Sequence, residues 1–302
     1  MFSSQRTKSD IKDFNLEKYD LVFNGIGLDL RGKEACKFTS GNSKKLIECD
    51  YNPVEFIFET KNDGEYKPSE LVDLFNKYNP KTILLEGTTL KFSELLIILS
   101  TALKCDSVKK ISFTYIEPKE YKLKLNTEYP MPHRYDLTSG FGRLYPIPGF
   151  TKDFSRKGYS AHLIAFLGFE KTRFGRVVED DEGANIDKFS LIMAIPPFCP
   201  GWENSSLEHN SEYFINDRYE DVYFVPANNP SSAYNLLKKV QKSLGEKEKM
   251  IIAPFGTNLS AIGAAVYASE NQSICGVIYD HPRNQDGRSK GIGISHLYTI
   301  EK

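Results

Sequence analysis

Short apolar runs, bounded by polar or turn-forming residues, recur along the chain. Such runs are typical of strands that are buried on both faces of a parallel sheet. The segments between them have apolar positions at helical spacing and the lengths that βαβ units require. The predicted strands cover residues 19–23, 81–86, 109–116, 162–169, 190–195, 249–255 and 273–280. The pattern therefore predicts an α/β fold with mainly parallel sheets.

One strand-turn-helix pattern occurs twice. ILLEGTTLKFSELL, at 83–96, and IIAPFGTNLSAIGAA, at 251–265, both run from an apolar strand through Gly-Thr into an apolar helix. The other matching pairs, in the same order along the chain, are 67–78 with 229–240, 21–32 with 164–175, and the strands that end at Pro118 and Pro282. Repeats decide the whole fold when they are present. These correspondences predict an internal duplication.

The duplication predicts two tandem Rossmann-like units, with Gly87 and Gly256 in equivalent positions. We expect the first unit over 1–130 and the second over 158–302. Residues 131–157 join them and are rich in Gly, Pro and aromatic residues. Because large apolar side chains are costly to leave in water, we expect this segment to pack against the units. Its aromatic residues are Tyr135, Phe141, Tyr145, Phe150 and Phe154, and its candidate ligand contacts are His133, Arg134 and Asp136.

Charge and cysteine content narrow the classes of function. With 39 basic and 40 acidic residues the net charge is -1, so no global field favours nucleic acid or a membrane surface. The five cysteines are widely spaced and lack a C-x-x-C pair, which argues against a disulfide framework or a structural zinc site. No apolar stretch is long enough to span a membrane or to direct export. We expect a cytoplasmic protein, and no cofactor or metal site is identified.

The two Gly-Thr turns form the first candidate site. A helix N-terminus presents unsatisfied N–H groups, glycine permits close approach, and threonine adds a hydroxyl donor. Such turns can bind phosphate or ribose. Alternatively, Thr and Asn simply cap the helices, as these residues often do. The candidate residues are Gly87, Thr88, Thr89, Gly256, Thr257 and Asn258.

This turn resembles the ligand loop of CARF-type Rossmann domains, which bind cyclic oligonucleotide signals in prokaryotic defence. In each half the likeness covers a strand, Gly-Thr followed by a polar residue, and an apolar helix. It implies a nucleotide-binding sensor or regulatory component, in which one duplicated chain builds the pocket that such proteins usually form by pairing. That family commonly has a Lys after Gly-Thr, where this chain has Thr89 and Asn258.

The turns after the first strand of each half offer glycine, an acid and an arginine. Arginine can pair with a phosphate through two hydrogen bonds, and an acid can accept from a ribose hydroxyl. A local acid–arginine pair at a helix start is the alternative. The candidates are Gly25 and Arg31 in the first half and Gly168, Glu170 and Arg173 in the second.

Two loops of the second half complete the candidate set. Trp202 can stack on a nucleobase whose edge Glu203 and Asn204 read, although tryptophan is also commonly buried packing. The loop 279–291 is the most cationic strand-end loop and could supply partners for a phosphate. A histidine beside an aspartate there could also act as a general base. Its candidates are Asp280, His281, Arg283 and Arg288.

Two other classes of function stay open. Asp50, Glu59 and Lys61 form a D-x8-E-x-K pattern, and metal-dependent nucleases hold a cation between two such carboxylates. The same residues also suit a solvated strand end. A protein-interaction scaffold is the other alternative, because Rossmann-like sheets carry many unrelated functions. The sequence favours a nucleotide-like ligand in a pocket between the halves, with a protein partner as a further option.

Overall fold

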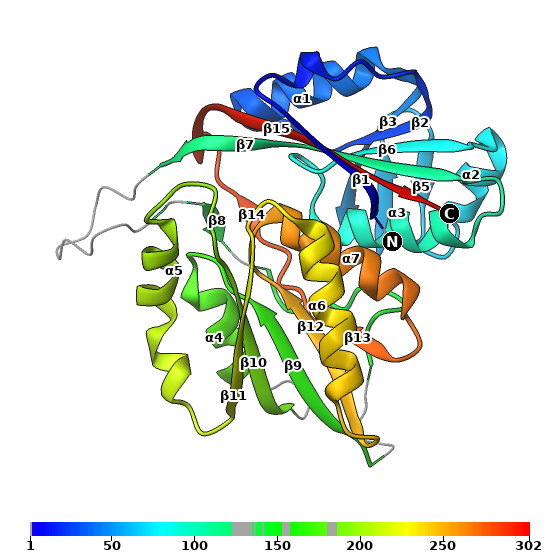
Figure 1. The fold of residues 1–302 in the computed structure, drawn as a ribbon. Helices are drawn as coiled ribbons and strands as arrows, with labels where there is room; N and C mark the ends of the chain where they lie inside the picture. Colours follow the sequence, from blue (N-terminus) through cyan, green and yellow to red (C-terminus); the bar gives the residue numbers. More distant parts are fainter. Residues whose placement is uncertain (1, 123–134, 136, 141, 153–157, 180–185) are drawn as a thin grey trace. The chain divides into compact units, whose positions relative to one another are not determined.

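The computed structural model describes residues 2–122, 135, 137–140, 142–152, 158–179 and 186–302 (Figure 1). The chain divides into two units, each described by itself below. Unit 1 comprises Met1–Lys122, Leu137–Ser139 and Asn284–Lys302, and unit 2 comprises Leu123–Asp136 and Gly140–Arg283. In both units helices alternate with strands along the chain, and the strands form largely parallel sheets. The predicted α/β class is therefore confirmed.

Unit 1 is built on a mixed eight-stranded sheet in the order β1-β15-β7-β6-β2-β3-β4-β5. Its strands are β1 (Phe2–Lys8), β2 (Tyr19–Asn24), β3 (Ser43–Asn52), β4 (Ile57–Thr60), β5 (Gly64–Tyr66), β6 (Thr82–Glu86), β7 (Lys110–Tyr121) and β15 (Ser289–Glu301). The central strands β3, β2, β6 and β7 are parallel. The hairpin β4–β5 and the pair β1–β15 add antiparallel strands on either side.

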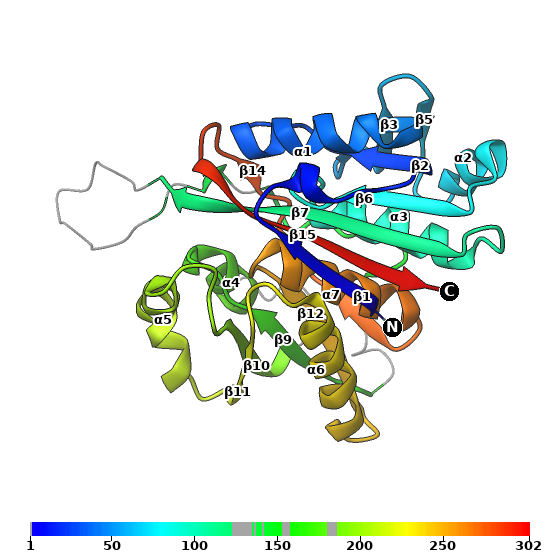
Figure 2. The ribbon, with the colours of Figure 1, turned by 45° about the horizontal axis from the view of Figure 1, so that its top comes forward.

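Three helices and a short 3-10 turn cover the sheet of unit 1. They are α1 (Leu30–Gly41), α2 (Leu71–Tyr78), α3 (Phe92–Lys104) and η1 (Ile11–Asp13). The helices α1 and α3 lie on opposite faces (Figure 2). The carboxylate of Asp29 accepts from Gly32 N and thereby caps α1. One core cluster joins η1, α1 and the sheet through Ile11, Phe14, Tyr19, Val22, Ala35, Leu84, Ile116 and Leu297.

Unit 2 has a five-stranded parallel sheet in the order β11-β10-β9-β12-β13. Its strands are β9 (Ser160–Phe166), β10 (Ile186–Ala194), β11 (Tyr219–Val225), β12 (Glu248–Pro254) and β13 (Cys275–Val277). From β9 the chain adds β10 and then β11 on one side of the sheet. It then adds β12 and β13 on the other side of β9. The strand order thus reverses between β9 and β12, and in unit 1 it reverses in the same way between β2 and β6.

The helices of unit 2 connect these parallel strands. They are α4 (Lys171–Glu179), α5 (Trp202–Asn210), α6 (Pro230–Ser243) and α7 (Asn258–Glu270), with the 3-10 turn η3 (Ser211–Ile215) after α5. Pro230 occupies the first turn of α6, where its missing N–H is no loss, and Asn229 caps the helix. A separate two-stranded sheet pairs β8 (Thr138–Gly140) with β14 (Arg283–Asn284).

The boundaries of the units differ from those expected from the sequence. The second unit was expected to include all of 158–302, but β15 pairs with β7 and β1 in the sheet of unit 1. The apolar residues of β15 are interrupted by polar ones such as Ser295, His296 and Thr299, so it lacks the continuous apolar run that marks the parallel strands. Within the described residues, no helix has both the length and the apolar character to cross a membrane.

The predicted connecting segment, 131–157, is divided between the units. Phe150 is buried as expected, and its carbonyl accepts from Val277 N at 2.9 Å, beside β13. Tyr145 is half-buried. Phe141, Phe154, His133, Arg134 and Asp136 lie outside the described residues.

Candidate ligand-binding site

The turns that follow β2 and β6 touch each other at the carboxyl edge of the unit 1 sheet. Gly25 N donates to Thr89 Oγ1 at 3.0 Å. A Cβ atom on Gly25 would lie 2.5 Å from the carbonyl oxygen of Thr89, so glycine is required by this close approach. The structure therefore brings together two residues that the sequence assigned to separate turns.

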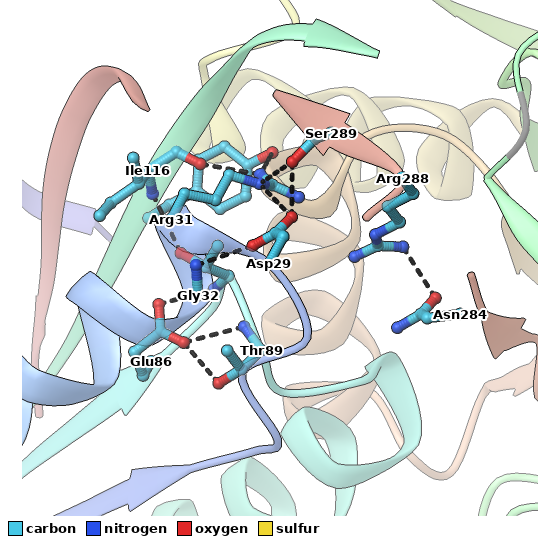
Figure 3. A network of polar contacts seen from close by, with 11 residues as sticks. Asp29, Arg31, Gly32, Glu86, Thr89, Ile116, Asn284, Arg288 and Ser289 are labelled. Carbon is cyan, nitrogen blue, oxygen red and sulfur yellow. Dashed lines mark hydrogen bonds and ion pairs between the residues drawn. The ribbon is translucent and has the colours of Figure 1, made fainter. Parts of the chain in front are cut away.

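A buried carboxylate occupies the Gly-Thr turn of unit 1 (Figure 3). Glu86 accepts from Thr88 N at 2.8 Å, from Thr89 N at 2.8 Å and from Thr89 Oγ1 at 2.5 Å. Burial raises the pKa of Glu86, and these hydrogen bonds oppose that shift. The backbone N–H groups of Thr88 and Thr89, which were predicted to bind a phosphate, thus donate to a side chain of the protein. Gly87 N donates to Thr114 O.

Sequence reasoning passed over Glu86, although it stands directly before Gly87. A polar residue that ends a buried strand was the available signal. In unit 2 the corresponding position holds Phe255, and α7 begins immediately after the Gly-Thr pair. In unit 1, by contrast, α3 begins only at Phe92. The two turns follow equivalent strands but differ in local geometry.

Thr257 caps α7, as the alternative interpretation held. Its hydroxyl accepts from Ser260 N at 3.1 Å and lies 3.0 Å from Ala227 O, to which it donates. The preceding Gly256 lies close to Gly168, at the turn that follows β9. The turns after β9 and β12 therefore meet at the carboxyl edge of unit 2, next to the reversal of strand order.

A buried ion pair links the first turn of α4 to a loop of unit 2. Arg173 donates to Asp280 through Nε at 2.9 Å and Nη2 at 2.7 Å, and its guanidinium lies 4.8 Å from the ring centre of Phe255. Burial alone would lower the pKa of Arg173, but the charge and hydrogen bonds of Asp280 raise it above its ordinary value. Because the pair is bidentate, it ties the start of α4 to the loop after β13.

Trp202 belongs to a cluster of three aromatic rings in unit 2. Its ring centre lies 5.9 Å from that of Phe169 and 6.1 Å from that of Tyr135. The rings meet largely edge to face, as aromatic clusters prefer. Glu203 accepts from Gly201 N at 2.8 Å, and Asn204 is exposed. Trp202 is half-buried by this packing.

The other candidates of unit 2 have defined but separate environments. His281 has a left-handed backbone with φ of 42°, and its Nε2 lies 3.0 Å from Tyr145 O. The neighbouring Asp280 bonds to Arg173, so it does not orient the imidazole as a general base would require. Glu170 is half-buried, and Arg283 is exposed.

The residues of the nuclease pattern do not converge on a cation site. Asp50 and Glu59 are cross-strand neighbours on β3 and β4, but Lys61 forms an ion pair with Glu48 at 2.6 Å. Asp50 instead forms an ion pair with Lys91. Across the described residues, no three His, Cys, Asp or Glu side chains are grouped so that they could hold a metal ion.

Arg31 lies at the centre of a polar network in unit 1 (Figure 3). It is buried, and it donates through Nε to Asp29 Oδ2 at 3.1 Å and through Nη1 to Ile116 O at 2.8 Å. Ser289 donates to the same Asp29 oxygen at 2.5 Å. Burial alone would raise the pKa of Asp29, but the charge of Arg31 and the hydrogen bonds keep it below its usual value. The network fastens α1 to β7 and β15.

Arg288 places a second guanidinium beside this network (Figure 3). Its Nη1 donates to Asn284 Oδ1 at 2.7 Å, and no carboxylate among the described residues is within ion-pair distance of it. Burial and the charge of Arg31 both lower the pKa of Arg288. Asp29 is the ion-pair partner of Arg31, so among the described residues the two guanidinium groups share this one carboxylate, and Arg288 has no carboxylate of its own. A bound anion would stabilise such a charge.

No protein-family model matches the chain, and no curated protein sequence matches it. The geometry of the described residues therefore carries the functional argument. Of the predicted candidates, the structure groups Gly25, Thr88, Thr89, Arg31 and Arg288 in unit 1 and Gly168, Arg173, Gly256 and Asp280 in unit 2.

Proposed function

We propose that the protein binds a nucleotide-like ligand at the carboxyl edge of the unit 1 sheet, with Arg288 as the partner of a ligand phosphate. The observation that carries this proposal is the half-buried guanidinium of Arg288, which has an amide oxygen as acceptor and no carboxylate partner among the described residues. A phosphate would neutralise the charge and accept two parallel hydrogen bonds. It would also relieve the repulsion between Arg288 and Arg31.

The strand order supports this location. In open parallel sheets, ligands bind beyond the carboxyl ends of the strands, where the strand order reverses. The turns after β2 and β6 flank such a reversal, and the turns after β9 and β12 flank another. We further propose that both units are Rossmann-like and arose by duplication. Gly87 and Gly256 follow topologically equivalent strands, and each unit pairs a buried Arg near the start of a helix with a buried Asp.

A sensor or regulatory role, in prokaryotic defence, is the biological part of the proposal. It is supported by the resemblance of the Gly-Thr turns to the ligand loop of CARF-type domains. Because Glu86 occupies this turn in unit 1, we assign the phosphate to Arg288 rather than to the N–H groups of Thr88 and Thr89. The expectation that both halves share one pocket stays a prediction.

Replacement of Arg288 by glutamine tests the proposal. Glutamine keeps a hydrogen-bond donor and removes the charge. Charge-assisted hydrogen bonds contribute about 1.5–3 kcal/mol, so we expect Arg288→Gln to weaken nucleotide binding roughly 10- to 150-fold. Isothermal titration calorimetry with ATP, GTP and cyclic oligoadenylates measures the effect.

Lys109→Gln is the matched control, because it removes an exposed positive charge at the opposite end of the sheet, just before β7. The control should bind as the wild type does. Circular dichroism spectra that match the wild type would show that both variants fold. Equal affinities of the wild type and Arg288→Gln, or no binding of any nucleotide to the wild type, would contradict the proposal.

A further inference from the structure

The stretch from Ile26 to Arg31, which covers the turn after β2 and the first residues of α1, has its charged side chains inside and its apolar side chains outside. Ile26, Leu28 and Leu30 are 61%, 38% and 58% exposed, whereas Asp29 and Arg31 are only 9% and 2% exposed. Charged residues are rarely buried in soluble proteins, and large aliphatic residues are usually inside. The inverted pattern of this short stretch therefore needs an explanation.

The network around Arg31 explains why the charged residues point inward. Asp29 has an extended backbone, with φ of -122° and ψ of 175°, and in extended chain successive side chains point to opposite sides. When the Asp29 carboxylate turns inward to cap α1 and to bind Arg31, its neighbour Leu28 is directed outward. Gly27 packs closely on the first turn of α1, where a Cβ atom would lie 3.1 Å from the backbone of Gly32. The apolar side chains are thus displayed on a fixed backbone.

Exposed apolar residues concentrate at this edge of unit 1. Among the described residues, eleven large apolar side chains are exposed, and five of them lie just after β2 or β3, on the following loop or at the start of α1. These two strands are parallel neighbours, so their loops leave the same edge of the sheet. The five residues are Ile26, Leu28, Leu30, Val54 and Phe56. A concentration of this kind marks a binding surface.

We propose that Ile26, Leu28 and Leu30 form the surface that receives the base of the nucleotide. This inference rests on the proposed function, which places the phosphate at Arg288. Both parts of the site belong to one region of unit 1: Arg288 lies beside Asp29 and Arg31 (Figure 3), and Leu28 and Leu30 are the chain neighbours of Asp29.

A nucleotide has both of the features that this edge complements. Its phosphates are anionic, and the flat faces of its base are largely apolar. Aliphatic side chains pack against such faces and gain free energy from the area removed from water. Inorganic tripolyphosphate has the same phosphate chain and no base, so its binding would depend on Arg288 and not on the leucines.

The double variant Leu28→Ser, Leu30→Ser tests the inference by calorimetry with ATP, GTP and tripolyphosphate. Because both side chains are exposed in the unliganded protein, we expect the variant to fold and to keep its melting temperature within a few degrees. The affinity for ATP or GTP should fall about tenfold, because serine removes less apolar area of the base from water than leucine does. The affinity for tripolyphosphate should not change. Val72→Ser, at a similarly exposed site on α2, is the control and should alter neither.

Each outcome separates the inference from the proposed function. Unchanged nucleotide affinity in the double variant, with Arg288→Gln weakening both probes, would overturn the inference and leave the proposed function standing. An equal loss for tripolyphosphate and nucleotides would also overturn it, because the leucines would then support the phosphate site instead of the base. If the wild type binds neither probe, the proposed function fails and the inference fails with it.

Discussion

Glu94, near the start of α3, is a buried carboxyl group that holds two backbone segments together. Its oxygens accept from Lys91 N at 2.7 Å and from Tyr51 N at 3.1 Å. Burial raises the pKa of Glu94 to about 8; the charge of Lys91 opposes the shift, and that of Asp50 adds to it. The folded protein therefore holds a proton on this group at a pH where the unfolded chain has released it.

The pH dependence of stability follows from this shift. The folded-state pKa lies above the ordinary value of 4.5, so the stabilisation is complete below pH 4.5 and is lost as the pH rises toward 8. Glu94→Gln keeps an acceptor for the cap and cannot ionise. The free energy of unfolding of Glu94→Gln, minus that of the wild type, should therefore increase between pH 5.5 and 8, by up to about 1.4 kcal/mol per pH unit. Urea unfolding of both proteins at several pH values measures this difference. A difference that is independent of pH would contradict this assignment.

Single residues show what the sequence could and could not predict about the site. Arg288 was predicted because a cationic loop that follows a strand is visible in the sequence alone. Glu86 was not, because a carboxylate at a strand end is usually solvated, and only the folded turn brings Thr88 N and Thr89 N back to it. Whether a candidate cation is already paired, as Arg173 is with Asp280, likewise depends on residues distant in sequence.

Among the elements, the apolar strands were predicted best. Each predicted run overlaps a strand, because β2, β6, β7, β9, β10, β12 and β13 all contain buried apolar stretches. The strands β1, β5 and β15 carry many polar residues and were missed. These strands lie toward the sides of the sheet, where antiparallel pairing does not require a continuous apolar run.

The contact between the turns after β2 and β6 can be tested with a pair of glycine substitutions. Gly25→Ala would force a methyl group against Thr89 O, so we expect a loss of about 1–3 kcal/mol in stability. Gly41→Ala, in the last turn of α1, has no atom within 4 Å of the new Cβ and should gain about 0.5–1 kcal/mol.

Urea unfolding followed by far-ultraviolet circular dichroism measures both changes. The protein's one tryptophan, Trp202, belongs to unit 2, so its fluorescence reports on that unit separately. A gain in stability for Gly25→Ala, like that expected for Gly41→Ala, would contradict the close approach at Gly25.

At the scale of the whole molecule, the sheet of unit 1 depends on residues 284–302. The strand β15 lies between β1 and β7 and pairs with both (Figure 1). Deletion of 284–302 should therefore remove the cooperative structure of unit 1 and leave the sheet of unit 2 intact. Hydrogen exchange should become fast in β2, β6 and β7 and stay slow in β9, β10 and β12. Continued protection of β6 and β7 would contradict this dependence.

The same connectivity sets the order in which a newly made chain can fold. The ribosome completes β7 before it begins unit 2, and it reaches β15 only after unit 2 is finished. At about 5–20 residues per second, translation of the intervening residues takes on the order of 10–30 s. During that time β7 presents an unpaired edge to other nascent chains, which is a hazard for aggregation. Unit 2 can fold as it emerges, whereas the sheet of unit 1, although started first, is completed only after unit 2.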